Sequence, residues 1–556
     1  MRQSPLRVLF ALLVVVLPAA AWGARPGSAA VASAHPLATR AGLEVIEAGG
    51  NAFDAAVAVS AALGVVEPFA SGLGGGGFWL LHLAGEDRDV LVDGRETAPG
   101  EARADMYLDA GGEPVPGKSQ RGPLAAGIPG LPAGLVHLSE RYGRLPLADS
   151  LAPAIRVARE GYPLYARMRA GLLYKAPELR KHPAAAAAFL RDGEVPPIGT
   201  VIRLPGLATA LERLVSDGAA GYYRGETARA LVEAVRENGG IWTQADLAGY
   251  EVVEREPLVG RYGDVSIVVP PPPSAGGVAL IEALNILAAF ELAEMKRPDR
   301  VHLVVEALRR AFRDRGYLGD PDFVSMPIER LTDPDYAAGL RASIRIDRAT
   351  PSEVFAPLYA SAGGTETTHF SVIDADGNRV AGTQSLNAWF GGGFLVPGLD
   401  ILLNNEMDDF AVKPGAANLY ELVGADANGI EPGKRMLSSM TPTFLESPRG
   451  VAVLGTPGGS RIISMVLLAA LAWADGADAE AMATMPRYHH QYLPDEIQYE
   501  AGTFTAAELE ALRGRGHALS EVGRNYGNMA IVTWDYDGNR VRTASDPRGE
   551  GVGEVY

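Results

Sequence analysis

Residues 367–387 read TTHFSVIDADGNRVAGTQSLN, and this stretch decides our interpretation of the fold. Residues 369–373 predict a β-strand, and residues 379–387 predict a second one. Between them, residues 374–378 supply the Asp, Gly and Asn side chains that favour a tight turn. The stretch is therefore predicted to form a β-hairpin whose first strand begins near Thr367.

The register of this hairpin determines which residues meet at its open end. If the five-residue turn sets the register, Thr367 lies opposite Ser385, whereas a two-residue Asp-Gly turn would make Leu386 its partner. Ser385 and Asn387 are two residues apart, so they are expected to share one face of their strand. The hairpin thus gathers Thr367, Ser385 and Asn387 at one edge of a sheet.

The chain before the hairpin is predicted to be mostly helical and to end in a loose segment. Helices are expected over 36–48, 51–66 and 300–317, and strands over 78–81 and 265–269. Residues 342–366 lose this periodicity and contain Pro351, Pro357, Gly363 and Gly364. We therefore predict a mobile linker that ends at Glu366.

The N-terminus has the pattern of an export signal. Arg2 and Arg7 are followed by an apolar stretch over 8–21, and Ala21-Trp22-Gly23 offers small residues for cleavage after Gly23. A retained membrane anchor is the alternative, but the apolar stretch is shorter than the roughly 20 residues of a spanning helix. We predict a signal peptide over 1–23 and a periplasmic or secreted protein without a stable membrane span.

Composition narrows the classes of function. Apolar residues make up 47% of the 556 residues and charged residues 21%, as in globular proteins. The net charge of −17 argues against a nucleic-acid partner or an anionic membrane surface. The absence of cysteine excludes a thiol nucleophile, thiolate zinc sites and disulfides. We predict no metal and no cofactor.

Familiar catalytic and ligand-binding motifs are missing from the sequence. It contains no G-x-S-x-G, no H-E-x-x-H and no Walker loop. The glycine run 74–77 precedes a predicted strand, which favours a tight turn with close backbone approach over a phosphate-binding loop. The adjacent His489 and His490 would point to opposite faces of a strand, which favours packing roles over a metal site.

A series of ordered motifs, from about residue 30 to the C-terminus, resembles the gamma-glutamyltransferase family. Near the hairpin these are Thr367-Thr368-His369-Phe370-Ser371-Val372, Leu402-Leu403-Asn404-Asn405-Glu406-Met407-Asp408-Asp409-Phe410, Leu437-Ser438-Ser439-Met440 and Pro457-Gly458-Gly459-Ser460-Arg461. Further upstream they are His35-Pro36-Leu37-Ala38, Gly49-Gly50-Asn51-Ala52, Asp93-Gly94-Arg95-Glu96 and Tyr317-Leu318-Gly319-Asp320-Pro321.

The resemblance implies a fold and a processing event. The fold class is α+β, a four-layer αββα sandwich of the N-terminal-nucleophile hydrolase type built from two autoprocessed chains. Members of the family are made as one inactive chain that cuts itself before a threonine. In this sequence the cut falls between Glu366 and Thr367, giving a large subunit (24–366) and a small, catalytic subunit (367–556) that remain associated as a heterodimer.

The same resemblance assigns the catalytic groups. Thr367 would be the nucleophile, and its freed α-amine, with a pKa near 8, could take the proton of its own hydroxyl. Ser385 would orient that amine, and the amides of Gly458 and Gly459 would form the oxyanion hole. Without the resemblance, Thr367 would be interpreted as a polar residue at the start of a strand.

The remaining family positions imply a pocket for a zwitterionic γ-glutamyl group. The residues for the α-carboxylate are Arg95, Ser438 and Ser439, and those for the α-ammonium are Asn387, Glu406 and Asp409. Glu406 is glutamine in some members of the family. On their own, the two acidic residues would suggest only a solvated acidic loop. Tyr420 corresponds to a lid tyrosine of some members, with an ordinary surface aromatic as the alternative.

The implied reaction proceeds through a γ-glutamyl-threonine intermediate. Glutathione and related γ-glutamyl compounds would be the donors, and water or amino acid and dipeptide acceptors would receive the acyl group. A glutaryl or cephalosporin-type acylase of the same fold is the alternative, although its substrate lacks the ammonium. An exported amino-acid-binding protein is the alternative from another class, but it would need no strand-initial threonine after a linker.

Overall fold

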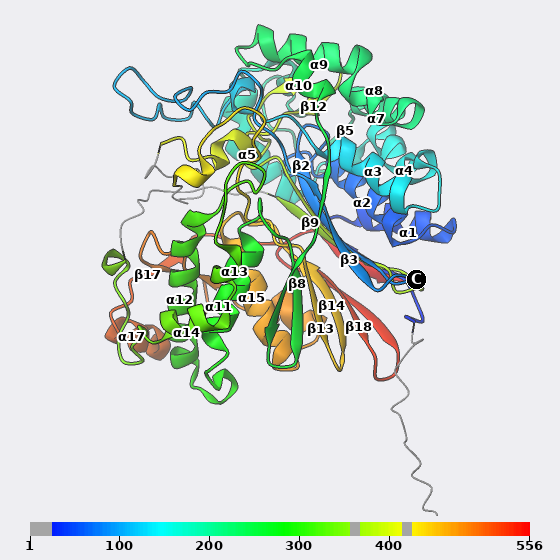
Figure 1. Cartoon of the computed structure of the whole chain (residues 1–556). Helices are drawn as coiled ribbons and strands as arrows, with labels where there is room; N and C mark the ends of the chain where they lie inside the picture. Colours follow the sequence, from blue (N-terminus) through cyan, green and yellow to red (C-terminus); the bar gives the residue numbers. More distant parts are fainter. Residues whose placement is uncertain (1–24, 356–366, 414–424) are drawn as a thin grey trace, which may run out of the picture.

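The computed structural model describes residues 25–355, 367–413 and 425–556, and these residues form four stacked layers (Figure 1). On one side, α1 (Pro36–Glu47) and α2 (Ala52–Val66) cover a seven-stranded sheet. On the other side, α11 (Gly276–Leu287) and α15 (Arg461–Ala474) cover a six-stranded sheet, and α12 (Arg297–Asp314) packs against α11. The predicted four-layer αββα sandwich is confirmed.

Both sheets are antiparallel throughout, and both combine strands from before and after residue 366. The order in the first sheet is β20 (Val552–Val555), β1 (Ala30–Ser33), β9 (Thr368–Ile373), β10 (Arg379–Ser385), β2 (Gly76–Leu83), β3 (Arg88–Gly94) and β6 (Val253–Arg255). In the second it is β19 (Arg540–Ser545), β18 (Ala530–Asp535), β14 (Gly450–Gly455), β13 (Thr443–Ser447), β8 (Val265–Val269) and β7 (Leu258–Tyr262). A cut before Thr367 would therefore leave two chains joined by strand pairing in both sheets.

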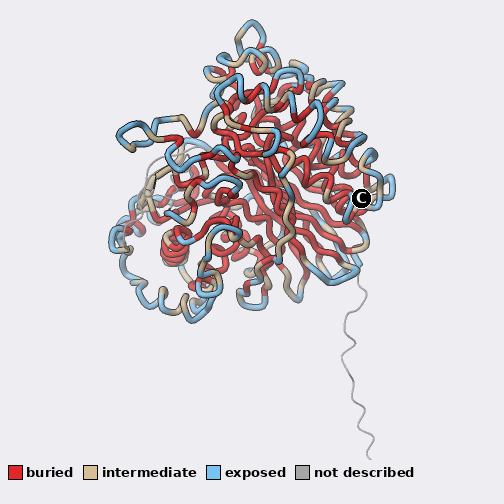
Figure 2. Tube along the Cα trace, turned by 45° about the horizontal axis from the view of Figure 1, so that its top comes forward, coloured by how far each residue is buried: buried red, intermediate tan, exposed pale blue. Residues whose placement is uncertain are grey.

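Strands β9 and β10 of the hairpin lie at the centre of the first sheet, and all their residues are buried. Figure 2 shows that the interior of the molecule around the sheets is mostly buried. Phe370 and Val372 point into the apolar layer beneath α1 and α2, because side chains alternate between the two faces of a strand. His369 and Ser371 point the other way, and the Ser371 hydroxyl donates to the Ala530 carbonyl of the second sheet. The hairpin is thus fixed from both faces.

The register of the hairpin follows the five-residue turn. Ile373 pairs with Arg379 and Thr368 with Gln384, which brings Thr367 opposite Ser385 as predicted. The second strand, however, ends at Ser385, two residues earlier than predicted. Asn387 has a φ of 72°, so the prediction that it shares a strand face with Ser385 was wrong. The chain leaves the sheet because Leu386 bonds to neighbouring loops instead.

The other predicted elements are largely confirmed. The helix predicted over 51–66 carries a capping box between Asn51 and Asp54, and the strand predicted over 265–269 has those limits. The helix predicted over 300–317 is α12 followed by a 3-10 turn, η3 (Arg315–Tyr317). Additional helices cover the upper part of the molecule: α3 (Leu131–Tyr142), α4 (Leu147–Glu160), α5 (Ala166–Leu179), α7 (Pro205–Asp217) and α9 (Gly225–Glu237).

The described part of the predicted linker is held in place, contrary to expectation. The Thr350 amide donates to the buried Glu306 carboxylate at 3.0 Å, and the Ser352 amide donates to Asp495 at 2.7 Å. Residues 342–355 lack helical periodicity but still make tertiary contacts, because the amides of Thr350 and Ser352 donate to Glu306 on α12 and to Asp495. Residues 356–366 and the predicted signal peptide lie outside the described residues. Within the described ranges, no helix has the length and apolarity to cross a bilayer.

Candidate active site

Thr367 lies at the head of β9, where three neighbouring segments fix its position. Its hydroxyl oxygen is 3.3 Å from that of Ser385, and the side chain is buried. The next residue, Thr368, donates its hydroxyl proton to Glu67 at the end of α2, 2.6 Å away. On the other side of β10, Gly76 pairs with Ser385. The hydroxyl of Thr367 is therefore positioned by sheet register and not by a flexible loop.

The turn after β10 ties the two hydroxyls to the rest of the pocket. The amide of Asn387 donates to Ser385 Oγ at 2.7 Å, which fixes that oxygen beside Thr367. The amide group of the Asn387 side chain donates to the Asn405 carbonyl at 3.0 Å. The glycine run 74–77 makes this close arrangement possible, since a Cβ on Gly75 would lie 2.1 Å from the Ser385 carbonyl oxygen. This confirms the predicted close backbone approach.

Three histidines of the small-subunit region, His369, His489 and His490, make structural contacts. His369, two residues from Thr367, is fully buried between Thr383 Oγ1 at 2.8 Å and Ser371 Oγ at 3.2 Å. Burial lowers its pKa to about 3. His489 contacts Ser464, and His490 contacts Asp495, as expected for packing roles. None of these three histidines is placed to act as the base for Thr367.

Gly458 and Gly459 lie between β14 and the first turn of α15. Their φ values of 145° and 58° are those that glycine adopts readily. Neither amide N–H takes part in a hydrogen bond with another described residue. Gly459 lines the same pocket as Thr367. The two amides at a helix N-terminus are thus available to stabilise a developing negative charge.

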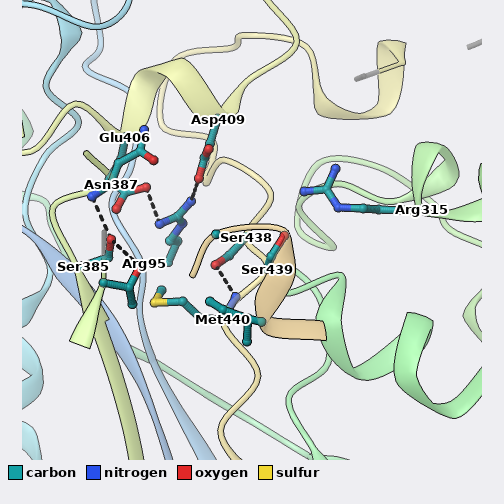
Figure 3. A pocket seen from close by; sticks show the side chains of 12 residues that line it. Arg95, Arg315, Ser385, Asn387, Glu406, Asp409, Ser438, Ser439 and Met440 are labelled. Atoms are coloured by element: carbon teal, nitrogen blue, oxygen red, sulfur yellow. Dashed lines mark hydrogen bonds and ion pairs between the residues drawn. The ribbon is translucent and has the colours of Figure 1, made fainter. Parts of the chain in front are cut away.

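At the other end of the pocket, the Arg95 guanidinium lies between two carboxylates. Its Nη1 is 2.6 Å from Glu406, and its Nη2 is 2.6 Å from Asp409 (Figure 3). Arg95 directly follows the last residue of β3, whereas the two acids occupy one 3-10 turn, η5 (Glu406–Asp409). Burial disfavours the charge of Arg95, but the neighbouring carboxylates more than offset this and raise its pKa.

The acidic groups around Arg95 are strongly perturbed by burial. Burial raises the pKa of Glu406 well above its ordinary value, although Arg95 acts in the opposite direction. Burial likewise raises the pKa of Glu96, which lies beside Arg95, to about 7. Burial therefore opposes full ionisation of the carboxylates around Arg95, and a positive charge close to them would favour their ionised forms.

Three polar atoms in this end of the pocket have no hydrogen-bond partner among the described residues: Glu406 Oε1, Ser439 Oγ and Arg315 Nε. The neighbouring Ser438 Oγ accepts a hydrogen bond from the Met440 amide at 3.1 Å. Buried polar atoms without partners are costly in a folded protein. One acceptor and two donors around one cavity therefore mark a site for a ligand that carries both kinds of group.

The structure brings most of the predicted site residues into one pocket: Arg95, Thr367, Ser385, Asn387, Glu406, Asp409, Ser438, Ser439 and Gly459. Gly458 is the neighbour of Gly459, and Tyr420 and Glu366 lie outside the described residues. Arg315, Met440 and Ile462 also line the pocket, and they were not among the site residues predicted from the sequence. The only signal for Arg315 was its position two residues before the Tyr317-Leu318-Gly319-Asp320-Pro321 motif.

The fold and the strand-initial threonine define an N-terminal-nucleophile hydrolase. A family model described as gamma-glutamyltranspeptidase matches residues 38–556. The chain belongs to this family.

Individual relatives agree with this assignment. The chain is 40% identical over 527 residues to the glutathione hydrolase proenzyme of Escherichia coli (strain K12), covering 93% of this chain and 90% of that protein. It superposes on the cephalosporin acylase of Bacillus halodurans with a TM-score of 0.82 at 29% identity, covering 98% of this chain and 99% of the other. For the Helicobacter pylori gamma-glutamyltranspeptidase the TM-score is 0.57 at 39% identity, covering 58% of this chain and 94% of the other.

Proposed function

We propose that this protein cuts its own chain between Glu366 and Thr367 and then hydrolyses or transfers γ-glutamyl groups. The products of the cut would be a large subunit ending at 366 and a small subunit beginning at Thr367. One observation carries the proposal: a strand-initial threonine in contact with Ser385 shares a pocket with unpartnered acceptor and donor groups. Shared strands in both sheets would keep the subunits together.

The chemistry requires only this chain's groups. The α-amine freed by the cut takes the proton of the Thr367 hydroxyl, and Oγ1 attacks the γ-carbonyl carbon. The amides of Gly458 and Gly459 stabilise the resulting oxyanion. Collapse breaks the amide bond, and the leaving amine receives the proton from the α-amine. The γ-glutamyl ester on Thr367 is then released by water or by an acceptor amine.

The charged end of the pocket supports a zwitterionic acyl group. The α-ammonium would bind Glu406, whose Oε1 has no partner among the described residues, together with Asp409 and Asn387. The α-carboxylate would bind Arg95 and the hydroxyls of Ser438 and Ser439. Glutathione and related γ-glutamyl compounds would be the donors, and amino acids or dipeptides would be the acceptors. A lid role for Tyr420 stays a proposal.

A cephalosporin-type acylase is the second candidate, because the Bacillus halodurans acylase matches the fold along nearly the whole chain. The charges favour the first candidate. A γ-glutamyl group brings an ammonium for Glu406 and Asp409, whereas a glutaryl group brings its carboxylate without that ammonium and leaves the two acids under-compensated. Paired assays on a γ-glutamyl anilide and a glutaryl anilide decide between the two.

Cellular location follows from the predicted signal peptide. We propose that the segment 1–23 directs export and is removed, which leaves a periplasmic or secreted enzyme. Fractionation of cells that express the full chain, with N-terminal sequencing of the large subunit, tests this. A large subunit that still begins at Met1 in the membrane fraction would support the retained anchor instead.

The decisive experiment uses the purified protein. A denaturing gel should show two chains, and incubation with glutathione should release free glutamate. Adding glycylglycine should yield γ-glutamyl-glycylglycine at the expense of glutamate. An exported amino-acid-binding protein would instead stay one chain and leave glutathione intact.

A further inference from the structure

A buried carboxylate that the proposed reaction does not use lies directly behind the nucleophile. Glu67, the residue that follows α2, is only 2% exposed, and its Oε2 accepts a hydrogen bond from the Thr368 hydroxyl at 2.6 Å. Successive side chains of a strand point to opposite faces, so Thr368 faces α2 whereas Thr367 faces the pocket. Glu67 therefore contacts the head of β9 from the face opposite to the pocket.

This position is electrostatically unfavourable for the helix. The C-terminus of a helix carries a partial negative charge, which disfavours a carboxylate there, and burial adds to the cost because the carboxylate loses its hydration. At the N-terminus of the same helix, Asp54 belongs to a capping box and accepts a hydrogen bond from the Asn51 amide at 2.9 Å. The stability of α2 thus explains Asp54 but not Glu67.

The hydrogen bond from Thr368 favours the ionised form of Glu67. A separation of 2.6 Å between the two oxygens is typical of a hydroxyl that donates to a carboxylate, and such a bond stabilises the charge. Burial raises the pKa of Tyr162 and Tyr165 well above its ordinary value, and the charge of Glu67 raises both further. Both phenols therefore stay neutral and leave the negative charge of Glu67 in place.

The charge of Glu67 is close enough to act on the Thr367 nitrogen. Thr367 and Thr368 are adjacent in the chain, so bond lengths alone keep the Glu67 carboxylate within about 10 Å of that nitrogen. Two unit charges at this separation, partly inside the protein, change each other's pKa by roughly 0.5 to 1 unit. A negative charge favours the ammonium form, so Glu67 raises the pKa of an amine at this nitrogen.

Other charged groups surround the same nitrogen. Those that line the pocket are Arg95, Arg315, Glu406 and Asp409. His369 on β9 is neutral, because burial lowers its pKa to about 3. Behind the strand, Arg167 and Glu550 act electrostatically on Tyr165. A substitution confined to Glu67 changes the charge of none of these groups, so its effect on the amine can be isolated.

We propose that Glu67 is a positioning residue for the Thr367 amine: it holds the head of β9 through Thr368, and its negative charge makes the freed amine a stronger base. A stronger base takes the hydroxyl proton more readily in the attack on the substrate. The counterpart is that a larger fraction of the amine is protonated, and therefore inactive, at acidic pH. This inference rests on the proposed function.

Glu67→Gln tests the charge alone, because the glutamine side-chain oxygen can still accept a hydrogen bond from Thr368. The measurement is the pH dependence of kcat/KM on the γ-glutamyl anilide, whose acidic limb reports the pKa of the base in the free enzyme. We expect the midpoint of that limb to lie roughly 0.5 to 1 pH unit lower than in the wild type. The plateau above the midpoint should be equal or lower, since the amine is then a weaker base.

Asp54→Asn is the matched control. Asp54 is a fully buried carboxylate of the same helix, but it lies about 20 Å from Glu67 along the helix axis. Loss of its capping contacts should lower the melting temperature. The midpoint of the acidic limb should not move, because a charge at that distance from the amine is largely screened. The control thus separates damage to α2 from loss of the charge beside Thr368.

The possible outcomes have separate meanings. A midpoint for Glu67→Gln that is unmoved or higher would overturn the assignment, whatever the plateau. Partial self-cleavage does not obscure the result, since a midpoint does not depend on the amount of cut enzyme. If Glu67→Gln is not cut at all, Glu67→Asn removes the same charge and takes its place. Failure of both variants to be cut would also overturn the assignment, because Glu67 would then be needed before the amine exists. A wild-type protein that does not turn over the γ-glutamyl anilide would instead refute the proposed function itself.

Discussion

The reacting end and the charged end of the pocket are built in different ways. At the reacting end, Thr367 and Ser385 are uncharged residues on adjacent strands, and sheet register brings their oxygens together. At the charged end, Arg95, Glu406 and Arg315 come from three segments that are far apart in the chain. The first arrangement is local and rigid, whereas the second depends on complementary charges. We infer that the sheet positions the reacting groups and that the ion-pair cluster selects the acyl group.

The two ends should therefore respond differently to substitution. A change at the reacting end should abolish the chemistry for every substrate and affect self-cleavage as well. A change at the charged end should leave self-cleavage intact, because the proposed cut does not use the charged groups. Its effect on turnover should depend on the charge of the substrate.

The largest effect is expected for Thr367→Ala. Removal of the proposed nucleophile should leave a single, inactive chain, because the proposed cut and the proposed turnover use the same hydroxyl. Thr367→Ser is the matched control, since it keeps a hydroxyl at the same atom and should still process. Gel electrophoresis and N-terminal sequencing, with the small subunit beginning Thr-Thr-His in the wild type, are the measurements. A fully processed Thr367→Ala protein would remove Thr367 from the cut.

The second largest effect concerns the choice between acyl groups. We expect kcat/KM for the γ-glutamyl anilide to be at least about a hundredfold higher than for the glutaryl anilide. A site built to bind a polar group strongly disfavours a substrate that lacks this group. Without the ammonium, Glu406 and Asp409 remain under-compensated in a buried pocket. Asp409→Asn should lower the ratio of the two kcat/KM values, chiefly by lowering kcat/KM for the γ-glutamyl anilide. Equal or better turnover of the glutaryl compound would favour the acylase.

A smaller effect is expected for Arg95→Lys. A lysine keeps the charge but cannot hold Glu406 and Asp409 at once, so about 2 kcal/mol of transition-state stabilisation should be lost, measured as kcat/KM on the γ-glutamyl anilide. Self-cleavage should survive. Arg255→Lys is the control, because Arg255 also bridges two carboxylates, of Asp93 and Asp322, but outside the pocket. Wild-type kinetics in a processed Arg95→Lys protein would contradict this role for Arg95.

The two ends also differ in how far the sequence predicted them. The pairing of Thr367 with Ser385 followed from counting residues across a five-residue turn, because a hairpin register is a local property. The contact between Arg95 and Glu406 spans 311 residues, and only the family resemblance placed both in one site. Local sequence patterns could not predict this contact.

The features that the sequence did not predict correctly also depend on contacts between distant parts of the chain. Asn387 leaves the strand because Leu386 bonds to loops that lie far away in the sequence. Arg315 lies in a 3-10 turn after a long amphipathic helix, where an arginine most often faces solvent. The segment 342–355 has no periodicity, yet it is fixed by hydrogen bonds to Glu306 and Asp495. Each of these depends on tertiary contacts that composition and periodicity do not report.

The smallest expected effect separates two adjacent serines at the charged end. Ser438 Oγ accepts from the buried Met440 amide, so Ser438→Ala leaves that amide without a partner and should destabilise the fold by about 1 kcal/mol. Ser439 Oγ has no partner among the described residues, so Ser439→Ala should leave the melting temperature unchanged. It should instead lower kcat/KM on the γ-glutamyl anilide about fivefold, as expected for the loss of one hydrogen bond to the substrate. On a γ-glutamyl anilide whose α-carboxylate is converted to a carboxamide, kcat/KM of the same variant should differ less from that of the wild type. The reason is that a charged acceptor forms the stronger hydrogen bond. If Ser439→Ala instead lowered the melting temperature with unchanged kinetics, Ser439 would be a structural residue, and the unpartnered hydroxyl would no longer support a carboxylate contact at this end of the pocket.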